Sequence, residues 1–145
     1  MISIRRAAAA VALALTLGAV VGVPAASAKA ESAWADDFFS LCVPDDAGCY
    51  GYTHGWIVWG NRTASISGTV ANEYASGFVT AYFEAYAGST KIDSDTRSVS
   101  SGTRGFPITL GNPDLVGGFD RTKVTVCWHG TEYQVCSRPQ HHWRD

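Results

Sequence analysis

The stretch from Thr122 to Cys136 reads TKVTVCWHGTEYQVC, and it decides the fold more clearly than any other part of the chain. Two runs of β-forming residues flank Gly130, with Cys127 in the first run and Cys136 in the second. Runs of Val, Thr, Tyr and Trp interrupted by Gly are typical of a β-hairpin. A disulfide between the two arms needs an oxidising compartment. The stretch therefore predicts a disulfide-linked hairpin in a β-rich, secreted protein.

Two registers are compatible with this hairpin. A two-residue turn at Gly130-Thr131 pairs Trp128 with Tyr133. A four-residue loop at Gly130–Tyr133 pairs Trp128 with Val135 instead, and it sets the two cysteines directly opposite each other. The disulfide favours the longer loop, because bonded cysteines need Cα atoms within about 7 Å. The apolar face is the same in both registers: Val126, Trp128 and Val135.

The first 28 residues have the pattern of a secretory signal peptide. Arg5 and Arg6 precede the apolar segment 7–23, and Ala26-Ser27-Ala28 supplies small residues for cleavage after Ala28. The alanine-rich composition is typical of such peptides in high-G+C bacteria. An uncleaved membrane anchor is the alternative, but it needs about 20 apolar residues and gives the Ala-Ser-Ala motif no role. We therefore expect an extracellular domain at residues 29–145, with no membrane attachment after cleavage.

The expected mature chain is a single, mildly acidic domain. Removing 28 of 145 residues leaves 117, which suits one domain. The basic residues fall from 11 to 9 while the 13 acidic ones stay, so the net charge is 9 − 13 = −4. Such a chain has no electrostatic reason to bind nucleic acid or anionic lipid.

All four cysteines lie in the expected mature chain, and an even number in a secreted domain predicts disulfides. Pairing Cys42 with Cys49 and Cys127 with Cys136 closes two short local loops. Zinc is the alternative, but neither spacing matches the short gaps of zinc motifs. The sequence therefore predicts two disulfides, no metal site and no cofactor.

Alternating residues predict strands through the rest of the mature chain. These strands are expected at residues 56–59, 63–71, 78–87, 91–98 and 106–110. Charges at 91–98 and Pro107 in the last segment are typical of edge strands. Segments 98–105 and 111–118 are expected to be loops. Segment 33–41 predicts a short helix instead, because Trp34, Phe38 and Leu41 recur at helical spacing. Six or seven strands of this kind predict a small antiparallel β-sandwich of immunoglobulin-like size. A small β-barrel is the alternative.

Aromatic residues are the strongest indication of function. Five tryptophans and six tyrosines are many for one small domain, and they do not all fit in its core. Aromatic side chains on a β-sandwich surface stack on sugars or pack on partner proteins. The candidate binding residues are Trp56, Trp59, Tyr82 and Tyr86. We expect a non-enzymatic protein that binds a glycan or an extracellular protein.

Two alternatives stay open. A small hydrolase would need Glu84 or a histidine in a cleft beside a second polar group. No serine lies in a nucleophile motif and no histidine pattern fixes a catalytic geometry, so no catalytic residue is predicted. A secreted enzyme inhibitor is the other alternative, because the size and the two disulfides resemble the subtilisin-inhibitor type of protease inhibitor. That family places a Cys-Pro pair before its scissile residue, whereas here Pro44 follows Cys42 by two residues.

Overall fold

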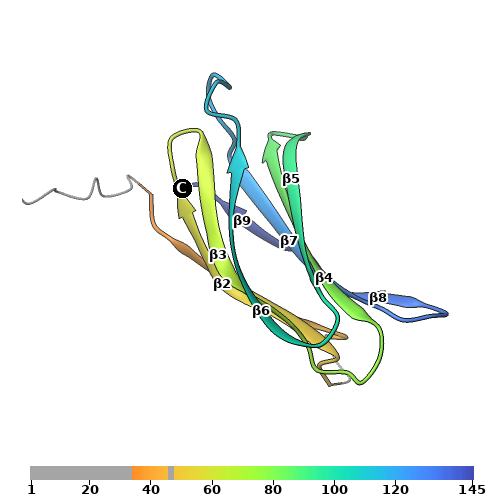
Figure 1. The fold of residues 1–145 in the computed structure, drawn as a ribbon. Coiled ribbons are helices and arrows are strands. Elements are labelled where there is room, and N and C mark those ends of the chain that lie inside the picture. The colour runs from red at the N-terminus through yellow and green to blue at the C-terminus, as the bar shows by residue number, and fades with distance from the viewer. Residues whose placement is uncertain (1–33, 46–47) are drawn as a thin grey trace, which may run out of the picture. The chain divides into compact units, whose positions relative to one another are not determined.

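The computed structural model describes residues 34–45 and 48–145, within one compact unit, Glu31–Asp145 (Figure 1). The predicted signal peptide lies outside the described residues. The described residues form nine strands and no helix: β1 (Asp37–Val43), β2 (Gly51–Trp59), β3 (Thr63–Asn72), β4 (Phe78–Ala87), β5 (Thr90–Val99), β6 (Gly102–Gly111), β7 (Arg121–His129), β8 (Gln134–Cys136) and β9 (Gln140–Trp143). This part of the chain accordingly holds no helix that could cross a membrane.

The strands form two antiparallel sheets that pack face to face as a β-sandwich (Figure 1). The four-stranded sheet has the order β1-β2-β3-β6, and the five-stranded sheet has the order β5-β4-β7-β8. Strand β9 shares an edge of β7 with β8, because β9 pairs with the first half of β7 and β8 with the second half. Neither sheet closes into a barrel over the described residues, so the predicted β-sandwich is confirmed.

The core lies between the sheets and is built by strict alternation. In β4, Val79, Ala81, Phe83 and Ala85 are fully buried, and β3 buries Ala64, Ile66 and Val70 in the same way. The serines and threonines that alternate with them in β3 face outward. Phe39, Ile57, Trp59, Leu110, Phe119, Val124, Val126 and Trp128 complete most of the core.

The predicted helix at 33–41 is wrong. Residues 37–43 form β1, in which Phe39, Leu41 and Val43 are buried while Phe38 and Ser40 are exposed. The buried residues Phe39, Leu41 and Val43 therefore follow the two-residue period of a strand and not the helical spacing of Trp34, Phe38 and Leu41. Pairing with β2 along its whole length decides the matter, because every residue of β1 has a cross-strand partner.

The starts of two strands differ from prediction by several residues, and one further strand was not predicted. Strand β2 begins at Gly51 rather than Trp56, and β6 begins at Gly102, which leaves only a two-residue link after β5. The expected loop at 98–105 is therefore wrong. Gly55 allows the longer β2 because it lies opposite Gly68, and a Cβ on Gly55 would stand 2.1 Å from the carbonyl oxygen of Ser67. The C-terminal tail contributes β9, for which no strand was predicted.

The hairpin and both disulfides agree with the sequence. Cys127 lies opposite Cys136 and Trp128 opposite Val135, which is the longer-loop register. The amide of Gly130 donates to the carbonyl of Tyr133 at 3.0 Å and closes that loop. The two disulfides join Cys42 to Cys49 and Cys127 to Cys136.

The open sides of the sandwich are closed by side chains from edge strands. β5 and β6 are edge strands, as predicted. Asp93 and Asp95 of β5 lie opposite inward residues of β4, so they point to the inner side of the sheet. From there Asp93 accepts a hydrogen bond from the amide of Gly111 in β6 at 2.9 Å. Inward charges of this kind discourage pairing with a second molecule.

Candidate functional site

The four predicted binding residues do not come together in one place. Trp56 lies on the outer face of the four-stranded sheet, whereas Tyr82 and Tyr86 lie on the outer face of the five-stranded sheet. Trp59 lies between the sheets, with only 2% of its surface exposed. The candidates therefore define two separate surfaces and one core residue.

Trp59 is a core residue rather than a contact surface. Its indole N–H donates to Asp37 Oδ2 at 2.8 Å, and its ring lies 5.6 Å from that of Phe119. Buried Trp usually has such a hydrogen-bond partner. The pattern of β2 correctly places Trp59 on the same face as Ile57, but that face is the inner one. Trp59 is therefore corrected from a binding candidate to a structural residue.

The outer face of the four-stranded sheet carries an apolar patch formed by Phe38, Trp56 and Val58. Phe38 and Trp56 are each about half exposed, with ring centroids 5.1 Å apart and planes tilted by 60°. Serines and threonines of β3 and β6 lie beside them across the sheet. None of the described strand residues on this face carries an Asp, Glu, Lys or Arg side chain.

The outer face of the five-stranded sheet has a different character. The register places its side chains in rows that cross β5, β4, β7 and the strand beyond. In order along β4, the rows are Lys91-Tyr86-Arg121-Trp143, Ser94-Glu84-Lys123-His141, Thr96-Tyr82-Thr125, Ser98-Thr80-Cys127-Cys136 and Phe78-His129-Gln134. The three central rows are therefore mainly polar around Tyr82, and the two end rows carry further aromatic residues, with Lys91 and Arg121 beside Tyr86 and Trp143.

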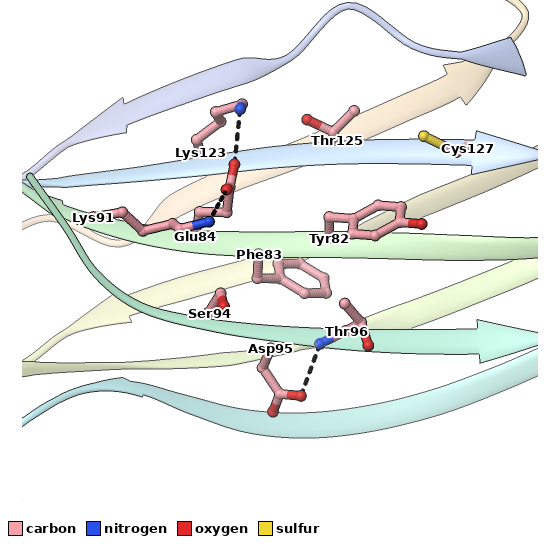
Figure 2. A pocket seen from close by; sticks show the side chains of 10 residues that line it. All are labelled: Tyr82, Phe83, Glu84, Lys91, Ser94, Asp95, Thr96, Lys123, Thr125 and Cys127. Atoms are coloured by element: carbon pink, nitrogen blue, oxygen red, sulfur yellow. Dashed lines mark hydrogen bonds and ion pairs between the residues drawn. The ribbon is translucent and has the colours of Figure 1, made fainter.

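A recess of about 330 Å³ opens at the centre of this face (Figure 2). We call it the β4 recess, and its lining residues are Tyr82, Phe83, Glu84, Lys91, Ser94, Asp95, Thr96, Lys123, Thr125 and Cys127. The first three rows supply most of this lining. Ligand sites are commonly concave, with an aromatic surface and a few well-placed polar groups. The β4 recess has both features.

Glu84 is held between two lysines on neighbouring strands (Figure 2). Glu84 Oε1 lies 3.1 Å from Lys91 Nζ, and Glu84 Oε2 lies 2.7 Å from Lys123 Nζ. Burial raises the pKa of Glu84, but the hydrogen bonds and charges of Lys123 and Lys91 outweigh it, so the net pKa is lowered. The hydrogen bond to Glu84 likewise raises the pKa of Lys123, against the effect of burial. Glu84 and Lys123 are therefore both ionised near neutral pH.

This charge state limits the chemistry available to the recess. Glu84 does lie in a hollow beside second polar groups, which is the geometry that the hydrolase alternative requires. A general acid, however, must hold a proton at the working pH, and a general base works best with a pKa near that pH. The lowered pKa of Glu84 suits neither role, because both of its oxygens already bind ammonium groups. The arrangement is suited to binding.

An aromatic cluster lies beyond the recess on the Phe78 side. The ring of His129 stacks on that of Phe78 at 4.5 Å, and His129 Nε2 lies 3.3 Å from the Tyr82 hydroxyl. Burial lowers the pKa of His129, so the imidazole is neutral at pH 7. The cluster fixes the orientation of the Tyr82 side chain.

A second aromatic cluster lies on the Tyr86 side. The Arg121 guanidinium carbon lies 4.2 Å from the centre of the Tyr86 ring and 5.2 Å from that of Trp143. Arg121 also approaches His141 Nδ1 at 2.8 Å. These contacts attach β9 to the sheet and leave Trp143 about half exposed. Trp143 was not among the predicted binding residues, because nothing in the tail sequence predicts the strand that carries it.

Comparison with known proteins adds no further assignment. No protein-family model matches the chain, and neither a curated protein nor a solved structure does. Within residues 34–45 and 48–145, no cluster of three or more His, Cys, Asp or Glu side chains could hold a metal ion. The two outer faces of the sandwich are therefore the features from which a function can be inferred.

Proposed function

We propose that this protein is a secreted, non-enzymatic binding protein that holds a carbohydrate chain across the outer face of the five-stranded sheet. The observation that carries the proposal is the β4 recess, in which the Tyr82 ring lies beside ionised and hydroxyl side chains. A sugar ring presents an apolar C–H face and a rim of hydroxyls. An aromatic side chain beside hydrogen-bonding groups is complementary to both.

The surroundings of the recess support an extended ligand rather than a single sugar. Exposed aromatic side chains continue the face in both directions, with Phe78 on one side and Trp143 on the other. These rings would contact further sugar units along a chain. The two disulfides are compatible with an extracellular location. The signal-peptide pattern at residues 1–28 supports secretion.

A glycan array probed with the secreted protein tests this proposal, with Tyr82→Ala as the decisive variant. We expect Tyr82→Ala to weaken binding about tenfold or more, because it removes the stacking surface of the recess. Tyr133→Ala is the matched control, since Tyr133 is an exposed tyrosine on the β7–β8 loop. Absence of glycan binding, or equal binding by Tyr82→Ala and the wild type, would refute the proposal.

Binding of an extracellular protein is a second candidate, favoured by the patch of Phe38, Trp56 and Val58. An exposed, uncharged aromatic patch is typical of protein contact surfaces. Affinity capture from the culture medium with wild-type protein and with Trp56→Ala tests this candidate. A partner captured only by the wild type supports it, and a partner captured equally by both contradicts it. The inhibitor alternative stays a prediction, to be tested against a panel of secreted proteases and amylases.

A further inference from the structure

The outer face of the five-stranded sheet has a charge opposite to that of the chain. The described strand residues on this face carry three cations, Lys91, Arg121 and Lys123, against one carboxylate, Glu84. Their sum is 3 − 1 = +2. The sequence as a whole has a net charge of −2. Positive charge is therefore gathered on this face rather than spread over the surface.

The alternation of β5 produces this segregation of charge. Ser94 and Thr96 share the outer face with Glu84 and Tyr82, whereas Asp93 and Asp95 pair with the inward residues Ala85 and Phe83. Asp93 binds the Gly111 amide, and Asp95 binds the amide of Thr96. Figure 2 shows Asp95 directed away from Glu84 and the lysines. Asp93 is thus turned to the inner side of the sheet. Asp95 does line the recess, but its carboxylate is directed away from the lysines and pairs with Arg97.

The two lysines have hydrogen-bonding capacity beyond Glu84. Each ammonium has three N–H donors, and each is contacted by only one oxygen of the Glu84 carboxylate. The Lys91 side chain is 52% exposed and the Lys123 side chain 30% exposed, so both ammonium groups can reach a ligand. Glu84 pairs with Lys123 in its own row and with Lys91 in the adjoining row, and Tyr82 lies in the row on the other side of Glu84.

We infer that the β4 recess takes an acidic polysaccharide, whose carboxylate or sulfate groups bind Lys91 and Lys123 while its sugar rings lie against Tyr82. This inference rests on the proposed function and specifies its ligand class. Charge-assisted hydrogen bonds to an ammonium are stronger than neutral ones. An acidic chain therefore gains contacts in the recess that a neutral chain of the same sugars does not make. Because the lysines are partly exposed, added salt screens the attraction.

The test uses isothermal titration calorimetry of the secreted protein with four probes of matched chain length. The probes are a polyuronate, its fully methyl-esterified form, a sulfated polysaccharide and poly-glutamate. The ester keeps the sugar rings and removes the charge, whereas poly-glutamate keeps the charge and removes the rings. The protein variants are Lys91→Gln, Lys123→Gln and Glu84→Gln. Arg138→Gln is the control, because Arg138 is 96% exposed and lies outside the face.

We expect at least one acidic polysaccharide to bind about tenfold or more tightly than the ester and poly-glutamate at low salt. Lys91→Gln and Lys123→Gln should each weaken this binding several-fold, and Arg138→Gln should leave it unchanged. Glu84→Gln should strengthen it and steepen its salt dependence, because the face then carries one more net positive charge.

If neither the polyuronate nor the sulfated polysaccharide bound more tightly than the ester, the inference would be overturned and the proposed function would stand. Equal affinity for poly-glutamate and the acidic polysaccharides would overturn it as well, because the sugar rings would then contribute nothing. Binding of none of the saccharides in this test or on the array would refute the proposed function itself.

Discussion

Glu84 shows how one residue acquires its role from strands that are distant in sequence. Its position among the aromatic residues of β4 predicted a carboxylate on a strand face, and the structure adds a lysine from β5 and another from β7. Neither ion pair could be read from the sequence, because both depend on the registers of β4 with its two neighbours. Trp59 makes the complementary point. Trp56 and Trp59 were placed in one predicted strand, but which of the two faced the core depended on the second sheet.

The Glu84 ion pairs should make stability depend on pH in a defined window. The pKa of Glu84 is lowered from 4.5 on folding, so its contribution is present above 4.5 and is lost as the pH falls through the folded-state value. The pKa of Lys123 is raised from 10.5, so its contribution is present below 10.5 and is lost as the pH rises through its folded-state value.

Glu84→Gln tests this window. At pH values where both Glu84 and Lys123 are ionised, the substitution should lower the free energy of unfolding by about 1 kcal/mol or less, because the ion pairs are partly exposed. Denaturant unfolding of both proteins from about pH 3 to about pH 9 measures the difference. The difference should shrink at the acid end. A difference that stays constant with pH would show that the ion pairs contribute nothing to stability.

At the level of elements, strands were predicted correctly where the alternation of apolar and polar residues did not also fit a helix. β3, β4 and the β7–β8 hairpin follow their sequence patterns closely. β1 was missed because its apolar residues fit both the two-residue period of a strand and the spacing of a helix. Only its pairing with β2 decides between the two. β9 was missed because it is a short polar strand. Its Gln140 side chain exchanges two hydrogen bonds with the backbone of Ser40 in β1, at 3.3 and 3.1 Å.

The two disulfides should contribute equally to stability and unequally to binding. Their cysteines lie 7 and 9 residues apart, so the chain-entropy account gives each about 2.5 kcal/mol. Only Cys127 lines the β4 recess, and its bond to Cys136 holds β8 against β7. Replacing Cys127 and Cys136 together by serine should therefore lower both stability and saccharide affinity. Replacing Cys42 and Cys49 together should lower stability alone.

Denaturant unfolding and calorimetric titration of the two double variants measure both quantities. An equal loss of affinity in both would contradict the assignment of the ligand to the five-stranded sheet. Equal affinity of the Cys127 and Cys136 variant and the wild type would show that the recess does not need the hairpin.

At the scale of the molecule, the sandwich presents two outer faces of opposite character. The face around Phe38 and Trp56 is uncharged, whereas the face around Tyr82 has a net positive charge and carries aromatic residues at both ends. The sequence predicted aromatic binding residues but placed Trp56 and Tyr82 in one set. Their separation depends on the assignment of β2 and β4 to different sheets, which local patterns do not contain.

The claim that the five-stranded sheet carries the ligand is tested most directly by amide chemical shifts. A titration of ¹⁵N-labelled protein with an acidic oligosaccharide locates the contact without any substitution. We predict shifts concentrated at Tyr82, Glu84, Lys123 and Thr125, which line the β4 recess, with Phe38 and Trp56 unchanged. Shifts concentrated at Phe38 and Trp56, or no shifts at all, would contradict the account.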